Sequence, residues 1–70
     1  MASYKEDIQY TFRVIGTPYQ FIATTDSEAK AREEVARFYL TKIGEGPGSP
    51  DFEERVREVA KQGLRLVFMR

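Results

Sequence analysis

The chain has 70 residues, with eleven basic and eleven acidic side chains and neither histidine nor cysteine. Residues 1–70 are therefore expected to form a single domain, and the composition excludes disulfides and the usual zinc sites. The balanced charge disfavours nucleic acid as a partner. The sequence has no run as apolar as a membrane span and no signal peptide, so the cytoplasm is the expected compartment.

Residues 8–15 alternate between apolar and polar side chains, which predicts a strand with one buried face. Gly16-Thr17-Pro18 interrupts the pattern, and the alternation resumes over residues 19–25. With Gly16 and Thr17 as the central turn residues, the buried faces of the two strands coincide. The sequence thus predicts a β-hairpin in which Val14 lies opposite Tyr19, Phe12 opposite Phe21, Tyr10 opposite Ala23 and Ile8 opposite Thr25.

A first helix is predicted over residues 26–42. Thr25-Asp26-Ser27-Glu28 has the spacing of a capping box with Thr25 as the cap. Gly44 is a natural terminator. Acid-first pairs four residues apart are expected to stabilise the surface of the helix. These pairs are Glu28–Arg32 and Glu33–Arg37. Apolar residues also recur every four positions, as in a helix with one buried side: Ala31, Val35, Tyr39 and Ile43.

A second helix and a closing strand follow a connection rich in glycine and proline. Ser49 as the cap and Pro50 at the first helical position predict a helix over residues 50–62. Gly63 ends this helix, and residues 64–69 again alternate in the manner of a strand. The alternation points Leu64, Leu66 and Phe68 inward and Arg65, Val67 and Met69 outward.

Together these elements predict an α+β two-layer fold in the order β-β-α-α-β. The hairpin and the C-terminal strand form a three-stranded sheet, and both helices pack on one face of it. The first strand is expected in the centre, because this order gives a right-handed crossover a route over the sheet. Alternating directions predict that the last strand runs parallel to the first. Seven aromatic side chains are expected to face inward: Tyr10, Phe12, Tyr19, Phe21, Phe38, Phe52 and Phe68.

The sequence indicates no catalytic, cofactor-binding or metal site and implies no small-molecule ligand. The protein is therefore expected not to be an enzyme. The common general base and the thiol nucleophile are absent. Neighbouring acids such as Glu53 and Glu54 point about 100° apart on a helix and cannot share one site. The glycine-rich loop before the second helix lacks the Gly-Lys-Ser/Thr ending of a phosphate-binding loop.

The sheet face away from the helices is the candidate interface, because it is half apolar and nothing predicted covers it. Its members are Thr11, Arg13, Ile15, Ile22, Arg65, Val67 and Met69. The favoured hypothesis is a non-enzymatic module that acts by protein–protein contact at this face or at an edge strand, with a second copy or another protein as partner.

Two alternatives stay open. An engineered or de novo designed scaffold without biological function is suggested because caps, turns and hydrophobic periods nearly all agree with one fold. A nucleic-acid-binding module is the weaker alternative. The outer face would offer Arg13 and Arg65 but no aromatic side chain on which a base could stack.

Overall fold

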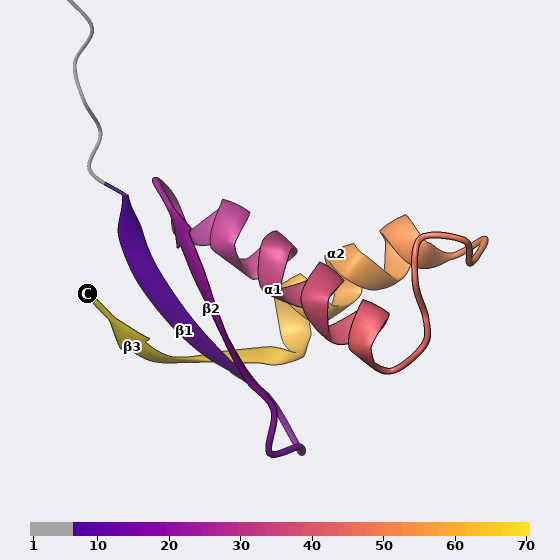
Figure 1. Ribbon diagram of the computed structural model, residues 1–70, viewed down its shortest axis with the longest axis horizontal. Coiled ribbons are helices and arrows are strands. Elements are labelled where there is room, and N and C mark those ends of the chain that lie inside the picture. Colours follow the sequence, from indigo (N-terminus) through magenta and orange to yellow (C-terminus); the bar gives the residue numbers. More distant parts are fainter. Residues whose placement is uncertain (1–6) are drawn as a thin grey trace, which may run out of the picture.

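The structure is a computed structural model that describes residues 7–70. It contains strands β1 (Ile8–Val14) and β2 (Gln20–Thr25), helices α1 (Glu28–Lys42) and α2 (Phe52–Gln62), and strand β3 (Leu64–Met69). The strands form one sheet in the order β2-β1-β3, with both helices on the same side (Figure 1). The predicted α+β fold, its element order and the central position of β1 are confirmed.

The predicted hairpin register is confirmed, with Phe12 opposite Phe21 and Tyr10 opposite Ala23. The turn itself lies one residue earlier than predicted. The Thr17 amide donates to the Val14 carbonyl at 3.1 Å, so Ile15 and Gly16 are the central residues of the turn. Gly16 has φ +82°, in the left-handed region that favours glycine.

Helix α1 begins two residues later than predicted, and Thr25 is not its cap. Thr25 remains in β2, paired with β1, while Ser27 adopts an extended conformation and its hydroxyl accepts a hydrogen bond from the Lys30 amide. The helix ends at Lys42, and Gly44 terminates it as predicted. Gly44 has φ +88°, and the amide that follows it donates to the Leu40 carbonyl at 2.8 Å. This is the Schellman arrangement, which satisfies carbonyls left free at a helix end.

Helix α2 also begins two residues later than predicted. Pro50 lies in a turn that the Phe52 amide closes on the Ser49 carbonyl at 3.2 Å, so it is not the first helical residue. Asp51 is the N-cap, but its side chain makes no capping hydrogen bond. Gly63 follows the last helical residue, as predicted.

Two clusters of buried side chains form the core, and α1 contributes to both. One cluster fills the space between α1 and the sheet: Tyr10, Phe12, Val14, Ala23, Ala31, Val35 and Leu64. The other joins the two helices: Ala36, Leu40, Phe52, Val56 and Ala60. Helix α2 therefore buries its apolar side mainly against α1, while α1 covers the sheet.

Strand β3 runs antiparallel to β1, so the predicted parallel direction is wrong. The prediction assumed that successive elements alternate in direction. Instead α2 packs on α1, and a single residue, Gly63, separates it from β3. The strand consequently starts beside the hairpin turn, where Leu64 pairs with Val14 and the Ile15 amide donates to the Gly63 carbonyl at 2.9 Å.

One of the two predicted ion pairs forms within α1. Arg32 binds Glu28 at 3.0 Å, as predicted. Arg37 binds Glu53 of α2 through two hydrogen bonds of 2.7 and 3.1 Å, and its predicted pairing with Glu33 is wrong. The helix–helix contact explains the difference, because it brings a carboxylate to Arg37 in bidentate geometry.

Candidate interface on the outer face of the sheet

The pairing of β3 with β1 is interrupted at one point. Phe12 pairs with Leu66, but the preceding residue of β1, Thr11, pairs with Phe68. Val67 is therefore one residue too many for regular pairing, which makes it the extra residue of a β-bulge.

The bulge reverses the faces of the two residues that follow it. Residues directly opposite each other on paired strands have side chains on the same face of the sheet. Phe68 therefore shares the outer face, the one turned away from the helices, with Thr11. Met69 pairs with Tyr10 and so lies on the helix-side face. The predicted directions of Phe68 and Met69 are both wrong, and Met69 does not belong to the outer-face set.

An apolar row crosses the outer face through all three strands. Ile22 of β2 pairs with Thr11 of β1, and Thr11 pairs with Phe68 of β3. The Ile22 and Phe68 side chains are 58% and 55% exposed. Ile15, which follows the end of β1, is equally exposed. Directly paired residues are neighbours, so Ile22, Thr11 and Phe68 form one row across the three strands, and Ile15 lies apart from it, beyond the row that contains Arg13 and Arg65.

The next row of the outer face carries two opposed cations. Arg13 and Arg65 are direct partners in the β1–β3 ladder, and both are exposed. Arg13 donates to Gln20 on its other side at 3.5 Å. Like charges directly opposite each other destabilise a sheet. None of the three strands contains an aspartate or glutamate, so no carboxylate within the sheet offsets this pair.

A shallow hollow adjoins the two arginines at the hairpin turn. Its volume is about 440 Å³, and Arg13, Ile15 and Arg65 line it together with the turn residues 16–18. At the opposite end of the sheet, the Arg70 and Gln9 backbones exchange hydrogen bonds of 2.9 and 3.2 Å. This pairing places Arg70 on the outer face as well. The face thus combines an apolar row with arginines on both sides of it.

The structure brings most of the predicted interface together. Thr11, Arg13, Ile22 and Arg65 share the outer face, Ile15 adjoins it, and Val67 occupies the bulge with its side chain 48% exposed. Phe68 and Arg70 are the members that the sequence did not predict. No local signal marks them, because the apolar alternation of residues 64–69 suits a regular strand equally well.

The other charged cluster lies between the helices. The cluster is the ion pair of Arg37 and Glu53. The hydrogen bonds from Arg37 lower the pKa of the Glu53 carboxyl below its ordinary value, and the same bonds raise the pKa of Arg37. Both side chains are solvent-exposed, and their geometry is that of a surface ion pair.

Residues 7–70 contain no group of three or more metal-ligating side chains. No helix in this part of the chain is long and apolar enough to cross a membrane.

In residues 7–70 the fold is a small two-layer α+β domain in which neither helix covers the outer face of the sheet. Comparison of the chain with protein-family models, with curated proteins and with solved structures gave no match.

Proposed function

We propose that this protein is a non-enzymatic binding module whose outer sheet face docks an acidic surface of a partner protein. The observation that carries the proposal is the Arg13–Arg65 pair, two like charges directly opposite each other in strands that contain no acid. Such an arrangement is unfavourable in the isolated domain and becomes favourable when a carboxylate approaches it. The cytoplasm is the proposed compartment, in keeping with a chain that has no cysteine.

The apolar row supports a protein as the partner. Ile22 and Phe68 flank Thr11 and would form the apolar centre of the contact, with Arg13 and Arg65 at its rim. Aromatic anchors and arginines are enriched in protein interfaces, and a charged rim steers the encounter and fixes the register. The complementary partner surface is an apolar patch bordered by aspartate or glutamate.

The proposal can be tested by titrating the ¹⁵N-labelled full chain with a ten-residue peptide of alternating glutamate and leucine. We expect the largest amide shifts at Thr11, Arg65 and Phe68, and weaker binding as the salt concentration rises. The double variant Arg13→Gln/Arg65→Gln should weaken binding at least tenfold. The matched control Arg55→Gln/Arg57→Gln removes the same charge from an exposed part of α2 and should bind like the unmodified chain.

Equal losses in the two double variants would mean that the peptide responds only to net charge, and the proposal would be wrong. Shifts confined to α2 or to the helix-side face would exclude the outer face as the docking surface. An isolated loss in the Arg13/Arg65 variant, with its amide spectrum otherwise preserved, supports the proposal.

Nucleic acid is the second candidate partner. Phe68 gives the outer face an aromatic ring, which the sequence pattern did not predict there. Single strands bind to proteins by stacking on such rings beside a positive groove. A parallel titration with decathymidylate separates the candidates. Tighter binding of the oligonucleotide than of the acidic peptide, lost on Phe68→Ala, would favour this second function.

A further inference from the structure

The two edges of the sheet differ in how they are protected against further strand pairing. The β3 edge carries Arg65 and the bulge at Val67, which are features that discourage edge-to-edge association. The β2 edge, with the sequence Gln-Phe-Ile-Ala-Thr-Thr, has no charge, no proline and no bulge. An unprotected edge of six residues is a template for another strand.

The polar backbone groups on the free edge of β2 follow from the hairpin. The Val14 amide donates to the Tyr19 carbonyl at 3.0 Å, and alternate residues of β2 from that point onward direct their backbone groups toward β1. The intervening residues, Gln20, Ile22 and Thr24, therefore present their N–H and C=O groups to the free edge. None of the three is proline, so all can donate.

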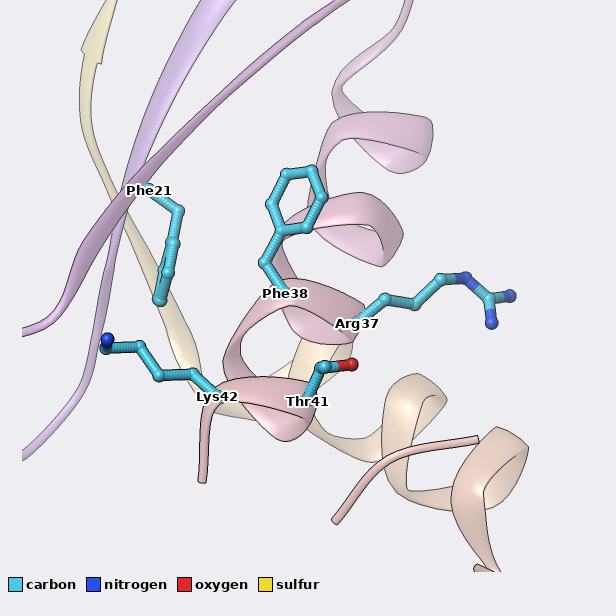
Figure 2. A pocket seen from close by; sticks show the side chains of 5 residues that line it. All are labelled: Phe21, Arg37, Phe38, Thr41 and Lys42. Carbon is cyan, nitrogen blue, oxygen red and sulfur yellow. The ribbon is translucent and has the colours of Figure 1, made fainter. Parts of the chain in front are cut away.

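A shallow apolar hollow runs beside this edge, between β2 and α1. Its volume is about 540 Å³. Figure 2 shows the Phe21 and Phe38 rings beside each other, with Lys42 reaching toward β2 and Arg37 pointing away. The two ring centroids are 6.3 Å apart, and the Phe38 side chain is still 44% exposed. A strand added to β2 would cover these rings.

We propose that the occupant of this edge is a second copy of the chain, which adds its β2 antiparallel to the first and creates a six-stranded sheet. A twofold axis beside Ile22 pairs Ile22 with its own counterpart and Gln20 with Thr24 of the other copy. This register uses every backbone group that the edge offers, and the same surface serves both copies, as a twofold interface requires. Two Ile22 side chains, each 58% exposed in the single chain, meet at the axis.

The charges along α1 suit such a twofold contact. Glu34 lies one helical turn before Phe38, and Lys42 lies one turn after it. With the axis beside Phe38, two antiparallel copies of α1 bring Glu34 of each copy to Lys42 of the other. Within one chain these two residues are eight positions apart, about 12 Å along the helix, and cannot pair directly. Dimerisation would also stabilise the fold, because a domain of this length has a low free energy of unfolding on its own.

The first test is the molar mass in solution, measured by sedimentation over a wide concentration range. We expect twice the 8.1 kDa of the single chain. Ile22→Lys places two cations at the axis, and Thr24→Pro removes an edge N–H that is not used within the hairpin. Each should return the mass to that of one chain with the circular dichroism spectrum unchanged. Val67→Lys, the matched apolar-to-lysine change at the β3 edge, should leave the dimer intact.

Charge exchange tests the register. Glu34→Lys alone and Lys42→Glu alone should each weaken dimerisation roughly fivefold, because two solvent-exposed pairs are lost. The double variant Glu34→Lys/Lys42→Glu should restore it. Rescue by the double variant requires contact between copies, since the two positions are too far apart to meet in one helix.

The inference does not rest on the acid-binding function, and the two fail separately. A monomer at every concentration would overturn the dimer whatever the outer face binds, and specific capture of an extended peptide at β2 by that monomer would assign the edge to another occupant. A dimer that persists in both Ile22→Lys and Thr24→Pro would also overturn the proposed interface. Loss of peptide binding in Arg13→Gln/Arg65→Gln bears only on the outer face.

Discussion

Leu40 provides the most direct test of how α2 is held in the fold. Its side chain is fully buried in the cluster that joins the helices, where it packs with Phe52 and Val56. Helix α2 makes few contacts with the sheet itself, so this cluster is its main attachment. Replacing Leu40 by alanine removes three side-chain carbons from the middle of that contact and leaves a cavity behind.

The expected loss is a large fraction of the total stability. A buried leucine-to-alanine change costs about 3–5 kcal/mol, whereas a domain of 70 residues has a total unfolding free energy of about 4–10 kcal/mol. With an m-value near 1 kcal/mol per molar urea, the unfolding midpoint should fall by about 3–5 M. Leu40→Ala should therefore be marginally folded at room temperature.

The measurement is urea unfolding followed by circular dichroism, at one protein concentration because self-association would shift the midpoint. Ile43→Ala is the control, since Ile43 is the C-cap residue of the same helix and is 38% exposed, and it should cost less than about 1 kcal/mol. A loss below 1 kcal/mol for Leu40→Ala would refute the described packing of α2 on α1.

Three further outcomes follow from local features. Arg37 lowers the pKa of Glu53, so the wild type should be more stable than Glu53→Gln above about pH 4.3. This difference in stability should vanish as the pH falls through the lowered pKa of Glu53. Urea midpoints measured at several pH values would show it. Gly44→Ala should cost about 1–2 kcal/mol in thermal unfolding, because φ is +88° there; Gly48→Ala, with no left-handed φ, should cost far less. Deleting Val67 should remove the bulge and make the pairing of β3 with β1 regular while Phe68 stays opposite Thr11 on the outer face, so nuclear Overhauser contacts between the Phe68 ring and Thr11 should persist.

The hairpin and the helices could be predicted because their determinants are local. The alternation of residues 8–15 and 19–25 fixes one register, since a slip by one residue would split the paired aromatic rings Phe12 and Phe21 between two faces. Glycine after the last helical residue similarly marks the end of each helix. The caps were placed less accurately, because Thr25 and Ser27 both have side chains suited to capping. Only the pairing of Thr25 with β1 decides between them.

The direction of β3 and its bulge depend on contacts far apart in the sequence. Five of the six residues in β3 are apolar, so the pattern does not specify which of them face the helices after Leu66. The extra residue at Val67 is visible only in the pairing with β1. The Arg37–Glu53 ion pair has the same origin, since it forms only once α2 lies on α1. Phe68, the aromatic member of the candidate interface, was missed for this reason.

The dimer and the acid-binding face have a joint consequence if both proposals hold. Joining two β2 edges makes the outer faces continuous and sets an Arg13–Arg65 pair on either side of the Ile22 contact. A partner with two acidic patches would then bind through both pairs, and the second contact would form within the complex at a high effective concentration. Thr24→Pro leaves both arginines in place. It should therefore weaken the binding of a divalent acidic peptide by a larger factor than the binding of a monovalent one. Equal weakening of both peptides would mean that the two surfaces act independently.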